Sequence, residues 1–220
     1  MSQKSKMSET HTQKLFNTPL SNSNSNSNSK PSILIIINPI SGKSKAVQFA
    51  NRIESQFKTS LNLKEKYTVR KFYSTYSDAI VHYIHDNQDF LKTCERIYSL
   101  GGDGTFHLII NALTDIDLQI PICIIPAGTG NGIYRSILHE NGEPDNQYIL
   151  DKYMYKMMEN PEKRVLDKMV IIEDSDAATE VEKPRVGVLG ISWGIISDID
   201  INTEWLRQLG SFRLHLGGFY

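Results

Sequence analysis

Short apolar runs alternate along the central part of the chain with segments whose apolar residues recur at helical spacing. The runs at 33–37 and 121–125 are continuous and rich in β-branched residues, a pattern typical of strands buried on both faces. Two further strands are predicted at 67–73 and 96–100. The pattern therefore predicts four strands separated by helices.

The segments between the predicted strands each carry one apolar face. The face of the first predicted helix comprises Val47, Ala50, Ile53 and Phe57. The second helix is expected to begin at Ser77 or Asp78, which are good N-cap residue types, and to point Ile80, Tyr83 and Ile84 inward. Further helices are expected up to about Leu113 and over 133–138. Successive strand–helix units predict an α/β fold with a mainly parallel sheet flanked by helices.

The pattern changes near residue 160 from alternating strands and helices to consecutive strands. A Tyr- and Met-rich helix is expected over 148–158, with its apolar stripe used for packing. Strands are expected over 163–172 and 184–200, joined by an acidic loop. The sequence thus predicts one α/β domain over 32–160, followed by the start of a β-rich second domain over 161–220.

Residues 1–31 have a different composition and are expected to be disordered. A Ser/Asn repeat over 21–29 contains no apolar residue, so it buries no surface that would offset the entropy of the chain. This segment is interpreted as a solvated tail without a role in the fold.

Composition narrows the classes of function. The 220 residues include 40% hydrophobic residues and carry a formal net charge of −1, so no overall basic character suggests a nucleic-acid partner. Cys94 and Cys123 form neither a metal-binding spacing nor a disulfide framework, which fits a reduced, cytoplasmic location. No apolar run of about 18 residues and no apolar signal core is found. Any membrane contact is therefore expected to be peripheral.

Gly- and Asn-rich turns follow three of the predicted strands, at 38–44, 101–105 and 126–132. Ligands of open parallel sheets bind at the carboxyl ends of the strands, and glycine turns before helices expose N–H groups to anions. The segment 41–44 is not a P-loop, because Ile37 stands where that motif requires glycine. Segment 128–133 likewise does not complete a dinucleotide-binding G-x-G-x-x-G motif. A less common phosphate-binding arrangement remains.

Asp103 is the single carboxylate within these turns, and the residues alone leave two interpretations of it open. It either caps the helix that follows or handles charge in a reaction. A second polar segment has Asp198 and Asp200 at a predicted strand end, followed by Glu204, Arg207 and Arg213. Without further information, this segment is best interpreted as a polar strand end followed by a solvated helix.

Three ordered motifs resemble the catalytic domain of the diacylglycerol kinase and sphingosine kinase superfamily. They are Asn38-Pro-Ile-Ser-Gly42, Gly101-Gly-Asp-Gly-Thr105 and Pro126-Ala-Gly-Thr-Gly-Asn131. The middle motif alone also occurs in NAD kinases and phosphofructokinases, so the combination carries the resemblance. It covers about 32–220 and implies an NAD kinase/diacylglycerol kinase-like N-terminal domain. Within it, 192–217 closely resembles a stretch characteristic of sphingosine kinases.

The resemblance implies an ATP- and Mg²⁺-dependent lipid kinase that phosphorylates the primary hydroxyl of sphingosine or a related sphingoid base, giving sphingosine 1-phosphate. Asp103 would be the catalytic residue that accepts the hydroxyl proton or orients the hydroxyl. Asp200, with Asp198 and Glu204, would bind the substrate, since a sphingoid base carries an ammonium group and diacylglycerol does not. No metal-ligating residue is assigned. The implied nucleotide-binding residues are Asn38, Ser41, Gly42, Ser74, Thr75, Gly101, Gly102, Gly104, Thr105, Gly128, Thr129, Gly130, Asn131, Arg207 and Arg213.

The chain departs from the family pattern at several positions. Ile40 stands where a basic residue is common, and Leu108 replaces a Glu of the family. His107, which lies beside the glycine turn, is interpreted as a packing residue. Family members continue into a β-sandwich, so a chain ending at Tyr220 is expected to be truncated in its C-terminal half. A diacylglycerol-type kinase and an inactive nucleotide- or lipid-binding remnant therefore remain as alternatives. An NAD kinase is disfavoured by 192–217, and the oligomeric state is left open.

Overall fold

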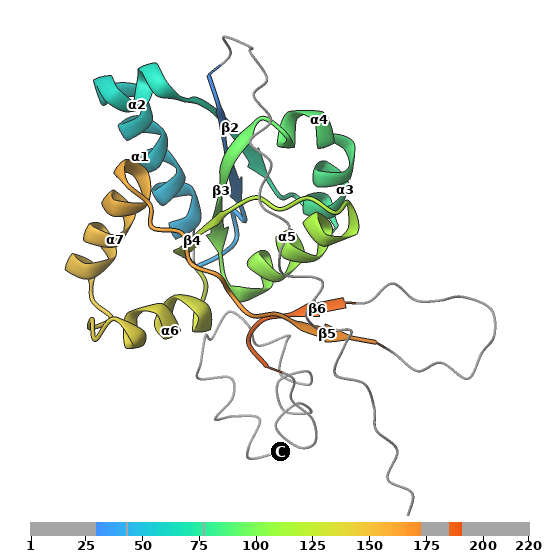
Figure 1. Cartoon of the computed structure of the whole chain (residues 1–220). Coiled ribbons are helices and arrows are strands. Elements are labelled where there is room, and N and C mark those ends of the chain that lie inside the picture. The colour runs from blue at the N-terminus through green and yellow to red at the C-terminus, as the bar shows by residue number, and fades with distance from the viewer. Residues whose placement is uncertain (1–29, 43, 77, 173–184, 191–220) are drawn as a thin grey trace, which may run out of the picture.

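The computed structural model describes residues 30–42, 44–76, 78–172 and 185–190. In these ranges four parallel strands form one sheet in the order β2-β1-β3-β4 (Figure 1). The strands are β1 (Ser32–Ile37), β2 (Thr68–Tyr73), β3 (Cys94–Gly101) and β4 (Ile122–Pro126). The predicted α/β fold with a mainly parallel sheet is confirmed, and the strand bounds differ from the predicted ones by at most two residues.

Helices cover both faces of the sheet (Figure 1). The first face is covered by α1 (Lys45–Thr59), α2 (Leu61–Lys66) and α7 (Gln147–Glu159). The second face is covered by α3 (Ala79–Asp86), α4 (Gln88–Leu91) and α5 (Asp103–Asp115). The remaining helix, α6 (Gly132–Glu140), connects β4 to the segment before α7.

Strand β1 lies at the centre of this sandwich. Its odd-numbered side chains, such as Ile33 and Ile35, pack against α1 and α7, whereas Leu34 and Ile36 pack against the helices of the opposite face. Every residue from Ile33 to Ile37 has no solvent exposure. Burial on both faces explains why this strand is a continuous apolar run and not an alternating one.

One of the predicted helix faces needs a correction. The buried face of α1 is formed by residues 46, 50, 53 and 57. The first position of this face is therefore Ala46, and the predicted Val47 is only half-buried at the margin of the core. In α3 the predicted Ile80 and Ile84 are buried, and Ala79 joins them. Tyr83 packs half-buried against the same core, as predicted, with its ring centroid 4.1 Å from that of Phe72.

The prediction of long strands after α7 is wrong in part. Residues 161–168 have no regular secondary structure, and an antiparallel pair follows, formed by β5 (Met169–Ile171) and β6 (Arg185–Gly187). Residues 162–168 are exposed and have no neighbouring strand in the described ranges, so nothing pairs with their backbone. The predictions for 1–29, for the acidic loop and for 191–220 lie outside the described residues. The domain boundary near residue 160 stays a prediction.

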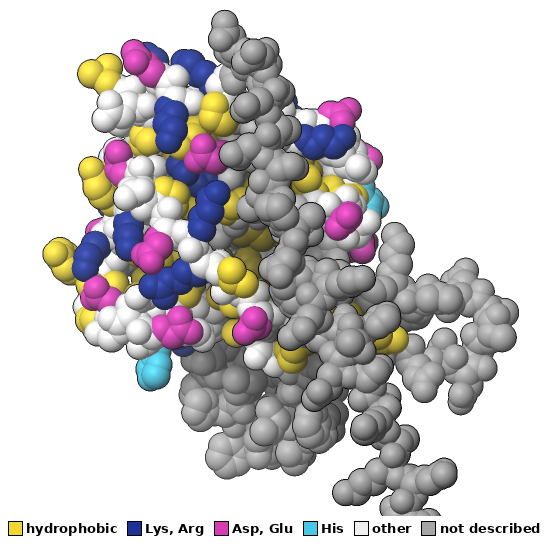
Figure 2. Space-filling view, viewed as in Figure 1, with side chains coloured by type: hydrophobic (Ala, Val, Ile, Leu, Met, Phe, Trp, Pro, Cys, Tyr) yellow, Lys and Arg dark blue, Asp and Glu magenta, His cyan; other side chains and the backbone are white. Residues whose placement is uncertain are grey.

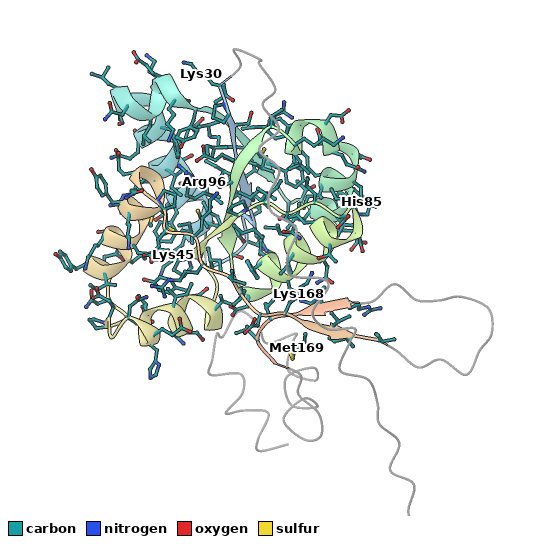
Figure 3. The ribbon with its side chains drawn as sticks, viewed as in Figure 1. Lys30, Lys45, His85, Arg96, Lys168 and Met169 are labelled. Carbon is teal, nitrogen blue, oxygen red and sulfur yellow. The ribbon has the colours of Figure 1, made fainter. Side chains whose placement is uncertain are left out.

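A buried cation holds α7 against the sheet (Figure 3). Arg96 on β3 is 3% exposed, and its guanidinium donates to the Met158 carbonyl oxygen at 3.1 Å and to the Glu95 carboxylate at 2.8 Å. The Tyr98 hydroxyl donates to the Met157 carbonyl oxygen at 2.7 Å. These carbonyls belong to the last turn of α7, where helix carbonyls lack partners within the helix and a cation is favourable. Arg96 therefore serves the packing of the domain.

Basic and acidic side chains are interspersed over the face formed by α1, α2 and α7 (Figure 2). Several of them form ion pairs, such as the exposed pair of Arg52 on α1 with Asp151 on α7 at 2.5 Å. Exposed pairs of this kind contribute little to stability. The face therefore has the charge pattern of an ordinary solvated surface. None of the helices in the described ranges combines the length and apolar character needed to cross a bilayer.

The two thiols provide a test of burial. Burial raises the pKa of Cys94 and the pKa of Cys123 from 9.0 to about 11. A thiol whose pKa is higher in the folded than in the unfolded state adds to the free energy of unfolding. This contribution is complete below about pH 9 and is lost as the pH rises to about 11. We therefore expect the urea midpoint to fall between pH 9 and 11. A disulfide-exchange reagent at pH 8 should react much more slowly with the folded than with the urea-unfolded chain; equal rates would contradict this burial.

Candidate active site

The strand order places the topological switch point between β1 and β3, because the chain continues from β1 to β2 on one side and returns to β3 on the other. Ligands bind at such points in open α/β sheets. Ile37 lies beside Leu100, and the Asn38 N–H donates to the Leu100 carbonyl oxygen at 2.9 Å. Since Gly101 in turn lies beside Pro126, the turns 38–44, 101–105 and 126–132 meet at one edge of the sheet.

The three turns contact one another through backbone atoms at their glycines. A Cβ added to Gly128 would lie 2.5 Å from the Gly102 Cα. A Cβ added to Gly42 would lie 2.1 Å from the Ala127 carbonyl oxygen, and Gly42 has φ +57°, a conformation that favours glycine. The turns therefore approach more closely than any side chain would permit.

A side-chain hydrogen bond between Asn38 and Thr105 connects the first turn to the second. The Asn38 amide donates to the buried Thr105 hydroxyl at 3.4 Å, and its oxygen accepts from the Ile40 N–H at 3.3 Å. A Cβ on Gly101 would lie 2.2 Å from the Thr105 hydroxyl oxygen, so this glycine makes room for it. Both polar side chains lie at the predicted site, and their hydrogen bonds shape its backbone.

Asp103 is the first residue of α5, and its carboxylate reaches across to the beginning of α6. One oxygen accepts from the Gly132 N–H at 2.9 Å and the other from the Ile133 N–H at 3.2 Å. The residue thus caps a helix, but that helix is α6 and not its own α5, whose N-cap residue is Gly102. A carboxylate offers about four acceptor positions, so this capping leaves room to accept a proton or hydrogen bond from a ligand hydroxyl.

Unused N–H groups are present at the same edge. Within the described ranges, the N–H groups of Asp103, Gly104, Thr129 and Gly130 donate to no protein acceptor. The helices α1, α5 and α6 all begin at this edge (Figure 1). Free N–H groups and the positive ends of helix dipoles favour anions, phosphate groups above all. The chemistry of the edge therefore fits the phosphates of a nucleotide.

Asn131 determines the shape of the third turn. It is the N-cap residue of α6 and has φ 52°. Its side-chain oxygen accepts from the Gly128 N–H at 2.9 Å, and its amide donates to the Gly128 carbonyl oxygen at 2.8 Å. This pairing leaves the neighbouring Thr129 and Gly130 exposed at the edge.

The other predicted nucleotide-binding residues differ in their position. The N–H and hydroxyl of Ser74 both donate to the Ile37 carbonyl oxygen, at 2.9 and 3.3 Å, so Ser74 lies beside the first turn. Thr75 follows it and is exposed. Ser41 is half-buried, and its N–H donates to the Asn38 carbonyl oxygen at 3.1 Å.

The predicted acidic and arginine segment is not placed by the structure. Its candidate residues lie outside the described ranges; they are Asp198, Asp200, Glu204, Arg207 and Arg213. Ile40 is 83% exposed, whereas Leu108 packs against the core on the α5 face of the sheet. Among the residues that the structure describes, no group of three or more His, Cys, Asp or Glu side chains forms a metal site.

Two residues near the site were not singled out by sequence reasoning. Asn111 on α5 binds the backbone of Val186, 75 residues away. Leu189 lies near Gly132, where an added Cβ would come within 3.2 Å of the Leu189 side chain. No local pattern marks them, because each acquires its role only through a partner distant in the chain.

The chain matches the diacylglycerol kinase catalytic domain over residues 32–158. This match includes all three turns and more than half of the chain. The chain therefore belongs to the diacylglycerol kinase catalytic domain family, which is a lipid-kinase family.

Within that family the chain is similar to sphingosine kinases. It is 26% identical over 200 residues to sphingosine kinase 1 of Homo sapiens, covering 85% of this chain and 47% of that protein. It is 28% identical over 205 residues to sphingoid long chain base kinase 5 of Saccharomyces cerevisiae, covering 90% and 27%. The chain thus spans about half the length of the mammalian sphingosine kinases it matches. A diacylglycerol kinase structure from Bacillus anthracis is 21% identical, with a TM-score of 0.40, covering 57% of this chain and 41% of that one.

Proposed function

We propose that this chain carries the catalytic α/β part of an enzyme that transfers the γ-phosphoryl group of ATP to the primary hydroxyl of sphingosine or a related sphingoid base. The observation that carries the proposal is the position of Asp103 where the three glycine turns meet. A carboxylate beside unused N–H groups supplies what this reaction needs: a partner for the acceptor hydroxyl next to a cradle for phosphates.

The nucleotide phosphates would bind at the N-terminal ends of α5 and α6. The unused N–H groups of Gly104, Thr129 and Gly130 would donate to phosphate oxygens, and the close glycine contacts keep side chains out of the way. Mg²⁺, arriving with ATP, would neutralise charge on the phosphates. The predicted Arg207 and Arg213 would add planar donors to the phosphates.

In the transfer step Asp103 would orient the acceptor hydroxyl and accept its proton. The hydroxyl oxygen forms a bond to the γ-phosphorus, and the bond from that phosphorus to the β–γ bridging oxygen breaks, so ADP leaves with the electron pair. The hydrogen bonds from the Gly132 and Ile133 N–H groups fix the Asp103 carboxylate in one orientation, which keeps it ready for the hydroxyl. The products are ADP and the phosphorylated lipid.

Similarity to sphingosine kinases supports a sphingoid-base acceptor over diacylglycerol. Asp200 gives this choice a physical reason, because a carboxylate would attract the ammonium group of a sphingoid base. The acceptor is a membrane lipid, so we infer a cytoplasmic protein that contacts the membrane peripherally. A diacylglycerol-type kinase is the second candidate, supported by the family match.

The assay that separates these candidates compares both lipids with the full-length protein. With ATP, Mg²⁺ and mixed micelles, we expect kcat/KM to be at least about tenfold higher for sphingosine than for diacylglycerol, a factor that corresponds to one charge-assisted hydrogen bond. Asp200→Asn should remove most of that preference by raising the KM for sphingosine, with the KM for ATP unchanged. Preferred transfer to diacylglycerol would support the second candidate. ATP binding without transfer to either lipid would indicate an inactive remnant.

A further inference from the structure

An apolar side chain, that of Leu189, lies beside the Asp103 carboxylate. A Cβ added to Gly132 would lie 3.2 Å from Leu189 Cδ2 and 3.4 Å from Leu189 Cδ1. The same added atom would lie 3.8 Å from the carboxylate oxygen Oδ2 of Asp103. Both methyl groups of Leu189 and this carboxylate oxygen are therefore within 4 Å of one point next to the Gly132 backbone.

This point adjoins one of the two hydrogen bonds that hold Asp103. The Gly132 N–H donates to Oδ2 of Asp103 at 2.9 Å. Both residues are only half-buried, so water has access to this part of the edge. Gly132 does not have a positive φ, so its backbone conformation does not require glycine. The missing side chain instead leaves the space that the Leu189 methyl groups approach.

Strand β6 holds Leu189 in this place. The Asn111 amide donates to the Val186 carbonyl oxygen at 2.9 Å, and its side-chain oxygen accepts from the Val186 N–H at 2.7 Å. These bonds connect β6 to α5, and the two elements lie side by side (Figure 1). Leu189 follows Val186 by three residues, a span of at most about 10 Å. The helix that begins with Asp103 therefore also holds the strand that leads to Leu189.

Water is a competing acceptor in phosphoryl transfer from ATP. In that reaction the water oxygen forms the bond to the γ-phosphorus, and the bond from that phosphorus to the β–γ bridging oxygen breaks, so ADP leaves with the electron pair. Asp103 would accept the proton of the water, and the products would be ADP and inorganic phosphate. A carboxylate that water reaches from every side would assist this hydrolysis as well as transfer to a lipid.

We propose that Leu189 is a specificity-determining residue that keeps water away from Asp103 and so favours a lipid hydroxyl as the phosphoryl acceptor, an inference that rests on the proposed kinase function. Its methyl groups exclude water from one side of the carboxylate. Its side chain is also 52% exposed, so it presents apolar surface at the edge. Such a surface favours an acceptor whose hydroxyl is attached to a hydrocarbon chain over water itself.

The test measures lipid phosphorylation and the release of inorganic phosphate by the full-length protein, with and without sphingosine in mixed micelles. In Leu189→Ala we expect phosphate release without lipid to rise at least about fivefold and transfer to sphingosine to fall at least about threefold. Leu189→Met keeps the apolar volume, so both rates should stay within about twofold of the wild-type rates. Hydrogen exchange of the Gly132 amide should be faster in Leu189→Ala, because its bond to Asp103 loses shielding from water.

Leu61→Ala is the matched control. Leu61 is 77% exposed and follows the end of α1, a helix that begins at the carboxyl edge of the sheet and runs away from it. Its variant removes the same exposed apolar volume far from Asp103. The ratio of hydrolysis to transfer and the exchange of the Gly132 amide should therefore equal those of the wild-type protein.

Gly132→Ala tests the position of Leu189 without any catalytic measurement. The added methyl group would lie 3.2 Å from Leu189 Cδ2, so the variant should lower the Tm. In the Leu189→Ala background the smaller side chain makes room, and the same substitution should lower the Tm less. Equal losses of Tm in the two backgrounds would overturn the placement of Leu189 beside Gly132.

The role of Leu189 and the proposed function fail in different ways. An unchanged ratio of hydrolysis to transfer in a folded Leu189→Ala variant, or an equal rise of that ratio in Leu189→Met, would overturn the exclusion of water by Leu189. Absence of transfer by the wild-type protein to any lipid would overturn the proposed function instead.

Discussion

Asp103→Asn is expected to lower phosphoryl transfer by about 10³-fold or more and to destabilise the fold by about 2 kcal/mol. The loss of transfer follows because a neutral amide accepts no proton from the acceptor hydroxyl. The loss of stability follows because the carboxylate accepts from both Gly132 and Ile133, whereas an Asn side chain has one acceptor oxygen and would turn its NH₂ group toward the other N–H. The negative charge at the beginning of α6 is lost as well.

Two measurements separate these effects. Steady-state transfer with the full-length protein gives the loss of activity, and urea unfolding gives the loss of stability. ATP binding should survive, since the N–H groups that would hold the phosphates are backbone groups. Asp115→Asn, at the other end of α5, is the control, because Asp115 contacts the His85 side chain at 3.6 Å and none of the three turns. Full activity of Asp103→Asn would exclude the proposed role in proton transfer, and unchanged stability would exclude a contribution of the cap.

Gly42→Ala and Gly128→Ala are expected to destabilise the protein by about 3 kcal/mol or more each. At Gly42 the new methyl group would lie 2.1 Å from the Ala127 carbonyl oxygen, in a backbone conformation that alanine rarely adopts. At Gly128 it would lie 2.5 Å from the Gly102 Cα. Both obstacles are backbone atoms of another turn, so relief requires the turns to move apart. ATP affinity should fall together with stability.

Gly104→Ala provides the comparison. No atom of a non-neighbouring residue lies within 4 Å of the added Cβ among the described residues, and φ is not positive there. Gly104 lies in the first turn of α5, so alanine should keep or raise stability by up to about 1 kcal/mol. Thermal unfolding of the three variants in parallel measures the contrast. Equal destabilisation at all three glycines would show that close packing of the turns is not the cause.

Much of the fold can be predicted from the sequence, because a parallel strand that is buried on both faces is a continuous run of apolar residues. The continuous run 33–37 and the run 121–125 give the correct strands, and parallel pairing then forces the three turns to one edge. The face of α1 that is buried is harder to predict from the sequence, since Ala46 and Val47 are both apolar and only packing in the folded protein selects between them. The predicted strand from 163 is wrong at its start because strand composition alone supplies no partner.

The location of the candidate site can be predicted from the sequence, but the contacts between its residues cannot. Glycine motifs after strands identify the turns, but they do not reveal that Asp103 caps a helix that begins 29 residues later. The pairing of Asn111 with Val186 has the same character, since it joins positions 75 residues apart. Such contacts depend on how the elements are packed, and each segment alone is compatible with other partners.

The capping of α6 by Asp103 has a consequence for how related sequences are compared. Catalytic residues are commonly a cost to stability, so a copy that has lost its activity is free to replace them. Here the carboxylate that is proposed to be catalytic also accepts the first N–H groups of α6, and selection for folding alone would retain it. The occurrence of Asp at this position across a set of sequences therefore measures selection on the architecture of this edge as well as selection on catalysis.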